Sequence, residues 1–174
     1  LYRDGPSLTG GVARAKFHYL EPMKVVRPPE AVPSSGPRVF LAGSIEMGKA
    51  APWQDDLAGM LQDTDFILLN PRRLDWDASW EQSAGSPPFR GQVLWELAGM
   101  EAAELIVMYL DPNTMSPVSL IELGLHARSG KLVVCCPDGF WRKGNVDITC
   151  MRYGTPMVAD LQALEAEIRR RLGR

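Results

Sequence analysis

Two glutamates interrupt stretches of sequence that are otherwise mostly apolar. Glu122 lies inside PVSLIELGLHAR, and Glu96 lies between Trp95 and Leu97 in QVLWELAGMEAAEL. A pair of carboxyl groups around one sugar carbon is the standard chemistry of glycoside cleavage, in which one attacks the carbon and the other handles a proton or a hydroxyl group. Exposed helix faces also carry many glutamates. Each residue is therefore either a catalytic candidate or a solvated side chain, and the surrounding elements must separate the two cases.

The segment around Glu122 has the signals of a helix over 117–128. Ser116 can cap the free N–H groups, Pro117 is tolerated in the first turn, and Gly130 follows the last turn. The polar residues form one narrow stripe at i, i+3 and i+7, made of Ser119, Glu122 and His126. This stripe is either the wet side of the helix or the lining of a site. Backbone N–H groups near the start of the helix are expected to keep Glu122 ionised, as a nucleophile requires.

Strands and helices alternate from residue 38 onward. Apolar runs predict strands at 39–44, 66–70, 105–110 and 132–136, helical patterns cover 53–63, 90–104, 117–128 and 158–172, and 138–156 has an irregular pattern. This alternation predicts an α/β fold with a parallel sheet and helices on both faces. Ligands of such sheets bind at the carboxyl ends of the strands. The polar segments after the strands converge there, which favours a site around Glu122.

Other candidate ligand contacts also follow predicted strands. Gly43 and Ser44 end the first strand, where small residues let a ligand approach the backbone N–H groups. The loop is not a GxGxxG motif, so a Rossmann dinucleotide site has little support. Arg72 and Arg73 follow the second strand and are candidates either to grip a phosphate or to pair with nearby aspartates.

A long segment without a regular period, residues 74–89, precedes the helix of Glu96. It carries Trp76, Trp80 and a Pro-Pro pair, which is typical of a loop. Long loops inside compact domains often cover binding sites. The two indoles are equally consistent with stacking on a base and with half-buried anchors of the loop.

The composition sets limits on class and partners. A chain of 174 residues, 45% of them hydrophobic, fits one domain. We place this domain at residues 38–174, after an N-terminal arm or linker at residues 1–37. Within the arm, Ala13–Leu20 is a possible strand. A net charge of −2 gives no general attraction to a nucleic-acid polymer or an anionic membrane, and no apolar run reaches the ~20 residues of a membrane span. Three cysteines and two histidines lack metal-site spacing, so we expect a reduced, cytoplasmic protein without metal or cofactor.

Five motifs in this order resemble the nucleoside 2-deoxyribosyltransferase-like family: VFLAGSI, NPRR, QVLWEL, SPVSLIELGLHARSGK and GNVD, within about residues 38–157. The resemblance implies a flavodoxin-like α/β fold, a homo-oligomer, and cleavage of an N-glycosidic bond through a glutamate nucleophile. The helix pattern E-x-G-x-A places this nucleophile at Glu122. The family's sugar-contacting or proton-carrying aspartate, eight residues before the acidic Glu104, falls on Glu96, whose extra methylene moves the carboxylate by about one C–C bond.

Two other positions give conflicting indications about the substrate. Ser116 stands six residues before the nucleophile, where transferases resembling this chain carry an aspartate and nucleotide N-hydrolases use a serine for the 5′-phosphate. Asn145 of GNVD instead matches the asparagine that transferases lend to a neighbouring subunit's 5′-hydroxyl. The sequence therefore leaves base exchange and hydrolysis open, on nucleosides or on their 5′-monophosphates.

The resulting hypothesis assigns a role to each candidate residue. Glu122 attacks the anomeric carbon, Glu96 or water assists the leaving base, and Gly43, Ser44 and Ser116 hold the sugar or phosphate end, while Trp76 or Trp80 covers the base. One alternative is a non-catalytic nucleotide-binding or regulatory module on the same fold. Another is cleavage of a larger base-containing cofactor such as NAD.

Overall fold

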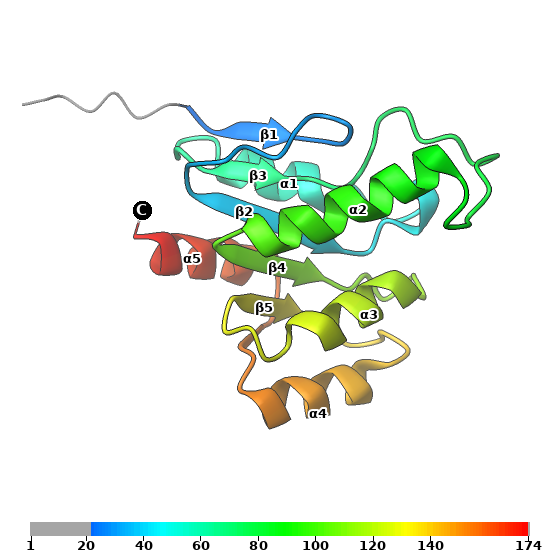
Figure 1. Ribbon diagram of the computed structural model, residues 1–174. Coiled ribbons are helices and arrows are strands. Elements are labelled where there is room, and N and C mark those ends of the chain that lie inside the picture. The colour runs from blue at the N-terminus through cyan, green and yellow to red at the C-terminus, as the bar shows by residue number, and fades with distance from the viewer. Residues whose placement is uncertain (1–21, 174) are drawn as a thin grey trace, which may run out of the picture.

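The computed structural model describes residues 22–173, which form a six-stranded parallel sheet covered by helices (Figure 1). The strands are β1 (Lys24–Val26), β2 (Arg38–Gly43), β3 (Ile67–Leu69), β4 (Leu105–Tyr109), β5 (Leu132–Cys135) and β6 (Met157–Val158). The helices are η1 (Glu46–Gly48, a 3-10 turn), α1 (Trp53–Met60), α2 (Pro87–Ala102), α3 (Pro117–His126), α4 (Lys143–Tyr153) and α5 (Leu161–Leu172). The predicted α/β class, with a Rossmann-like or flavodoxin-like parallel sheet, is confirmed.

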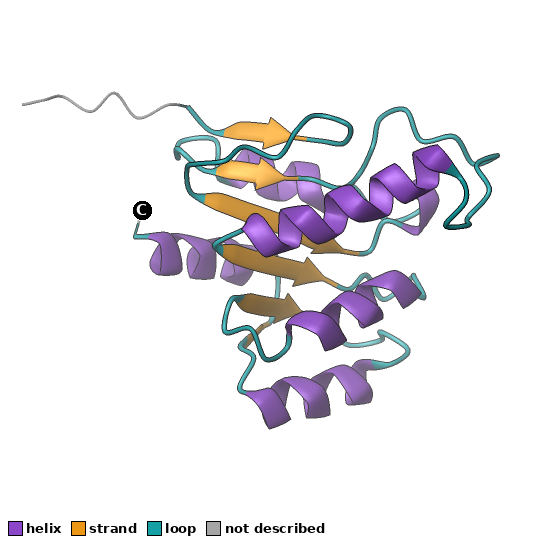
Figure 2. Cartoon of the chain, viewed as in Figure 1, coloured by secondary structure: helices purple, strands orange, loops and turns teal. Residues whose placement is uncertain are grey.

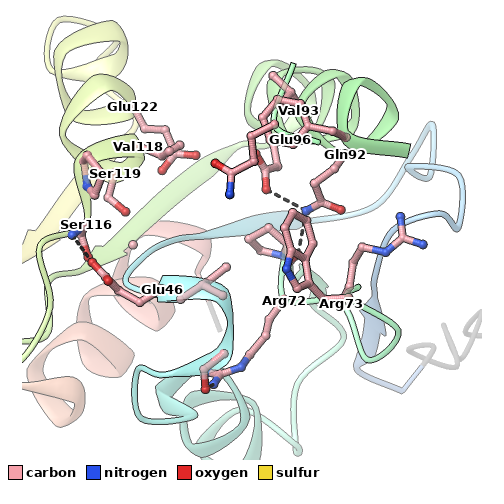
Figure 3. A pocket seen from close by; sticks show the side chains of 18 of the residues that line it. Glu46, Arg72, Arg73, Gln92, Val93, Glu96, Ser116, Val118, Ser119 and Glu122 are labelled. Carbon is pink, nitrogen blue, oxygen red and sulfur yellow. Dashed lines mark hydrogen bonds between the residues drawn. The ribbon is translucent and has the colours of Figure 1, made fainter. Parts of the chain in front are cut away.

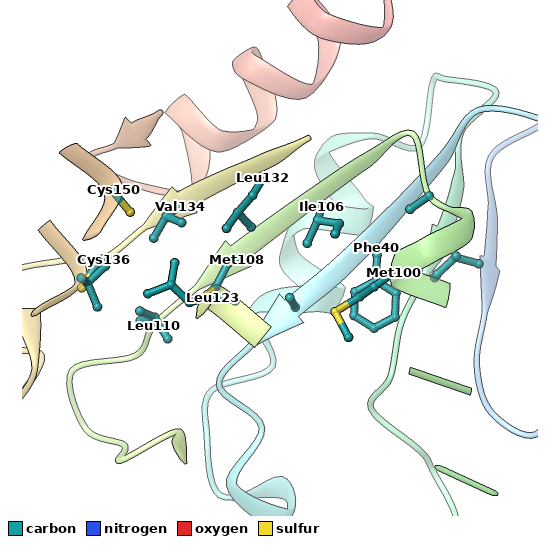
Figure 4. Close-up of a cluster of buried hydrophobic side chains, with 14 of the residues drawn as sticks. Phe40, Met100, Ile106, Met108, Leu110, Leu123, Leu132, Val134, Cys136 and Cys150 are labelled. Atoms are coloured by element: carbon teal, nitrogen blue, oxygen red, sulfur yellow. The ribbon is translucent and has the colours of Figure 1, made fainter. Parts of the chain in front are cut away.

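The strands are buried on both faces because their side chains alternate between two apolar layers. On β2, Phe40 and Ala42 belong to the layer under α2, α3 and α4, whereas Val39 and Leu41 belong to the layer under α1 and α5. Figure 2 shows the two sets of helices on opposite faces of the sheet. Figure 4 shows the first layer, where side chains of neighbouring strands meet residues such as Leu123 of α3. The helices that carry Glu96 and Glu122, α2 and α3, are therefore held by the same apolar core as the strands.

The N-terminal part contains a strand that the sequence pattern did not indicate. β1 pairs in parallel with β3, so part of the segment interpreted as an arm or linker forms one edge of the sheet. A strand of three residues next to a proline-rich stretch carries too short an apolar pattern to stand out. The strand suggested around Ala13–Leu20 lies outside the described residues, and the domain boundary at residue 38 stays a prediction.

The interpretation of 138–156 as irregular was wrong, because α4 occupies most of that stretch. Its apolar residues do not keep to one face: Val146 and Cys150 are buried, whereas Ile148 and Met151 are exposed. A helix with that distribution shows little amphipathic period. The last helix also begins later than predicted, since Asp160 accepts a hydrogen bond from the Ala163 N–H and caps α5 there.

The order of the strands, β1-β3-β2-β4-β5-β6, places a reversal of chain direction beside β2. β3 lies on one side of β2 and β4 lies on the other (Figure 1). The helix α2 connects β3 to β4 across β2, and α3 follows β4. Lys131, just before β5, ties down the end of α2 by donating to the carbonyl oxygens of Met100, Glu101 and Ala103. Ligand sites of open α/β sheets form at the carboxyl side of such a reversal.

Within residues 22–173, no helix combines the length and the apolar character needed to cross a bilayer.

Candidate functional site

A cavity of about 390 Å³ lies at the carboxyl edge of the sheet, between α2 and α3 (Figure 3). Its walls come from the end of β2, η1, the segment after β3, α2 and the first turns of α3. Residues that bear on its chemistry are Gly43, Glu46, Arg72, Arg73, Trp76, Gln92, Glu96, Ser116, Ser119 and Glu122. The structure therefore brings most of the predicted site residues to one cavity.

Two of the three residues of the polar stripe of α3, Ser119 and Glu122, line this cavity, whereas the half-buried His126 does not. Ser119 and Glu122 are buried, whereas Val118, Ile121 and Leu125 are each more than half exposed. The helix is thus seated with much of its apolar surface outward, the reverse of an ordinary surface helix. This orientation resolves the alternative that the spacing left open for Glu122.

Glu122 is only 8% exposed, and its carboxyl group has no hydrogen-bond partner within the described residues. Burial, and after it the charge of Glu96, raises the pKa of Glu122 to about 8. The expectation that backbone N–H groups keep Glu122 ionised was therefore wrong for the ligand-free cavity, because none of them reaches the carboxylate. A buried carboxyl group with a pKa this high is typical of a functional site.

Glu96 enters the same cavity from α2, so that two carboxyl groups face one space from two helices (Figure 3). Burial raises the pKa of Glu96, while a hydrogen bond from Gln92 acts in the opposite direction. The Gln92 amide nitrogen donates to Glu96 Oε1 at 2.7 Å and to the carbonyl oxygen of Pro71 at 2.9 Å. These two bonds fix the orientation of the Glu96 carboxyl group from one turn earlier on α2.

Two buried polar atoms of the cavity wall have no partner in the described part of the chain: Gln92 Oε1, an acceptor, and Trp76 Nε1, a donor. Buried polar groups are nearly always bonded, so unpaired ones in a cavity indicate places for ligand or water. Sequence reasoning missed Gln92. Its spacing of four residues before Glu96 was the available signal.

The start of α3 is capped by a residue from a distant part of the chain. Glu46 Oε1 accepts from the backbone N–H groups of Met115 at 2.7 Å and Ser116 at 2.6 Å. Ser116 is the N-cap residue as predicted, but its side chain makes no capping bond. Both Glu46 and Ser116 adopt left-handed backbone conformations, with φ of 47° and 44°. Such conformations cost on the order of 1–2 kcal/mol each in residues other than glycine, which indicates a strained and well-determined contact.

Three hydroxyl groups behind this cap are bonded to one another. Ser44, Thr114 and Ser116 lie within 2.6–2.8 Å of each other, and Thr114 also donates to the carbonyl oxygen of Asp111. Four contacts therefore share three hydroxyl protons, so at most three of these contacts are hydrogen bonds at any one time. Ser44 is fully buried and does not line the cavity.

Gly43 lines the cavity, but the sheet itself also requires glycine there. Its φ is 124°, and a Cβ atom would lie 2.1 Å from the carbonyl oxygen of Tyr109 on β4. This close approach lets the end of β2 pass β4 directly under the cavity. A glycine at position 43 therefore serves both the packing of β2 against β4 and the approach of a ligand to the backbone.

The remaining candidates lie at different places. Trp76 lines the cavity, whereas Trp80 does not and packs edge-on against Trp76 at 5.2 Å between ring centroids. Arg73 pairs with Asp75, and its guanidinium lies over the Trp80 ring. Asn145 is exposed on α4 and lines a separate, smaller depression of the surface.

The sequence model of one protein family, described as nucleoside 2-deoxyribosyltransferase like, matches residues 36–140 of this chain. The matched part contains β2 through β5, the cavity and both glutamates, and it ends before α4 and Asn145. The comparison with curated proteins found no match.

Proposed function

Because the chain belongs to the nucleoside 2-deoxyribosyltransferase-like family, we propose that it cleaves the N-glycosidic bond of a (deoxy)nucleoside or its 5′-monophosphate. The base is then released to water or exchanged for a second base through a covalent glycosyl intermediate on Glu122. The observation that carries the proposal is a pair of carboxyl groups at one cavity, the buried Glu122 on α3 and the half-buried Glu96 on α2.

In the first step a Glu122 oxygen forms a bond to the anomeric carbon, and the bond from that carbon to the base nitrogen breaks. The electron pair leaves with the base, which takes a proton from Glu96 or from water. In the second step water or another base attacks the same carbon and gives up its proton to Glu96 or to water, the bond to Glu122 breaks, and the Glu122 carboxylate is restored. Two displacements of this kind retain the anomeric configuration.

The electrostatics of the pair fit one acid and one nucleophile. Burial raises both pKa values, and the Glu96 charge further raises that of Glu122, so the two groups favour holding one proton between them. The chemistry requires that proton on Glu96 when substrate is bound. Hydrogen bonds from sugar hydroxyls to the Glu122 carboxylate would lower the pKa of Glu122, so that the shared proton moves to Glu96.

The unpaired polar atoms suggest how the rest of the substrate is held. In our proposal Trp76 covers the base, and Gln92 Oε1 accepts a hydrogen bond from a base amino group or a sugar hydroxyl. Gly43 lets the sugar approach the end of β2. Trp80 supports Trp76 from behind and does not touch the substrate.

A second candidate function is nucleotide binding without turnover. The observation that favours it is the pKa of about 8 for Glu122, which leaves the carboxyl group mostly protonated at neutral pH in the ligand-free cavity. A protonated carboxyl group is a poor nucleophile but a good hydrogen-bond donor.

We further propose that the chain works as a homo-oligomer in the cytoplasm. Val118, Ile121 and Leu125 of α3 form an exposed apolar face beside the cavity, and Leu94 and Leu97 add exposed apolar surface on α2. Asn145, which does not line the cavity of its own chain, would reach a neighbour's cavity in such an assembly.

The test is base release, followed by chromatography, from deoxynucleosides, ribonucleosides and their 5′-monophosphates, with and without a second base. Glu122→Gln should abolish release, while the exposed Glu101→Gln on α2 serves as the matched control. A 2-fluoro-2-deoxy nucleoside should leave a covalent adduct in the intact mass of wild type that Glu122→Ala lacks. Stabilisation by nucleotides without base release or adduct would support the binding module instead.

A further inference from the structure

We propose, on the premise of the function proposed above, that Glu46 makes the cavity selective for nucleosides that lack a 5′-phosphate. The N-terminus of a helix next to a cavity is the usual seat for a phosphate, which accepts from the free N–H groups there. Here the Glu46 carboxylate already accepts from the N–H groups of Met115 and Ser116, at 2.7 and 2.6 Å. The chain's own anion thus occupies part of that seat (Figure 3).

Glu46 is held in place by more than its own two bonds. Its backbone is in the left-handed region, as is that of Ser116 across the contact. Arg72 clamps the segment that follows, donating to the carbonyl oxygens of Gly48, Ala50 and Ala51. A phosphate would therefore have to displace a carboxylate whose position is fixed from both sides.

The charges around the cavity also oppose a phosphate. Its described walls carry three carboxyl groups, on Glu46, Glu96 and Glu122. The arginines among the same lining residues are Arg72, which is engaged with backbone carbonyls, and Arg73, which pairs with Asp75. Bonds to neutral carbonyls leave the charge of Arg72 in place, but they use N–H groups that a phosphate would need. The negative charges of Glu46 and of the Glu96–Glu122 pair disfavour a further anion.

The serine that nucleotide-binding relatives would use is already engaged with other side chains in this chain. The Ser116 hydroxyl lies 2.6 Å from Ser44 Oγ and 2.8 Å from Thr114 Oγ1, so a phosphate would compete with these two contacts for its proton. Glu46, in contrast, accepts both N–H bonds on Oε1, so Oε2 can accept a bond from a 5′-hydroxyl. Glu46 thereby supplies the acidic contact that an aspartate at position 116 would have provided.

The test compares wild type with Glu46→Ala and Glu46→Gln, and with Glu81→Gln, an exposed glutamate of the long loop, as the charge control. The first readout is the ratio of kcat/KM for a 2′-deoxynucleoside to that for its 5′-monophosphate. Wild type and the control should prefer the nucleoside at least about tenfold, and Glu46→Ala should reduce this ratio at least about tenfold. Glu46→Gln, which keeps the cap but loses the charge, should fall between them. A wild type that prefers the monophosphate, or an unchanged ratio in Glu46→Ala, would overturn the proposal.

A second readout does not depend on turnover. Isothermal titration with inorganic phosphate should show binding to Glu46→Ala and none to wild type, after thermal melts establish that each variant is folded. If no variant releases base from any substrate, the proposed function fails, whereas phosphate binding gained only in Glu46→Ala still supports the role of Glu46. Equal behaviour of wild type and Glu46→Ala in this titration overturns that role.

Discussion

Replacing the buried Glu122 with glutamine should stabilise the protein, and by an amount that depends on pH. In the folded chain the pKa of Glu122 is about 8, against an ordinary value of 4.5. Folding therefore takes up a proton at Glu122 between these two pH values. The contribution of this group to stability is greatest below about pH 4.5 and falls as the pH rises toward 8. Glutamine has nearly the same shape and no such proton to take up.

The size of the effect follows from the two pKa values. At about 1.36 kcal/mol per pKa unit, the wild-type penalty grows to roughly 3 kcal/mol at pH 7 and about 5 kcal/mol above pH 8. Local relaxation reduces these values, so we expect Glu122→Gln to be more stable than wild type by about 2 kcal/mol at pH 7. For a chain of this size that corresponds to a rise in Tm of roughly 4–8 °C.

The assay is urea unfolding of wild type, Glu122→Gln and the exposed control Glu101→Gln at pH 4, 7 and 8.5. The difference between Glu122→Gln and wild type should be near zero at pH 4 and grow at each step. The control should follow wild type throughout. A difference that does not change with pH, or a destabilised glutamine variant at pH 8.5, would refute the argument that Glu122 is a desolvated, unpaired carboxyl group.

Three further predictions concern the pair, the sheet and the outer face of α3. Glu96→Gln should lower base release by roughly 10²–10⁴-fold. Because the substitution removes a charge that raises the pKa of Glu122, it should also move adduct formation with a 2-fluoro-2-deoxy nucleoside to lower pH. An unchanged pH profile would contradict this coupling between the two glutamates. Gly43→Ala should cost more than about 3 kcal/mol or prevent folding, because its Cβ would clash with the backbone of β4, whereas Gly124→Ala, which meets nothing within 4 Å, should be neutral or stabilising in denaturant titrations. Ile121→Lys should lower the mass measured by light scattering if the apolar face of α3 holds an oligomer, and a monomeric wild type would exclude that role.

Much of the architecture could be predicted because a parallel sheet buried on both faces leaves nearly continuous apolar runs in the sequence. Runs such as VFLAG and LIVMY are visible without any partner strand. The convergence of polar residues on one edge follows from the same topology and predicted a site around Glu122, where a cavity lies. Glu96, which lines the same cavity, was suggested by the chemistry of paired carboxyl groups and by the family resemblance, not by the topology. The start and stop signals at Ser116, Pro117 and Gly130 predicted α3 as a helix.

Other features depend on contacts that no local pattern encodes. Glu46 caps a helix 70 positions away, so that its role becomes visible only when η1 and α3 are placed side by side. Ser116 has the residue type of a side-chain cap, yet its hydroxyl bonds to Ser44 and Thr114 instead. The pKa of Glu122 depends on how deeply α3 is seated, which the spacing of its polar residues does not determine.

The separate origins of the two carboxyl groups make the site modular. Glu96 is placed by α2, whose end is tied to Lys131, and Glu122 by α3 on the far side of the chain reversal, so their spacing is set by helices packed on the sheet. Trp76, in contrast, belongs to the segment between β3 and α2, which contributes a wall of the cavity. Beyond Pro71, whose carbonyl oxygen holds Gln92 beside Glu96, that segment can change in length and sequence while the carboxyl pair keeps its spacing. Under the proposed function, base preference can therefore diverge within this fold while the two carboxyl groups keep their roles.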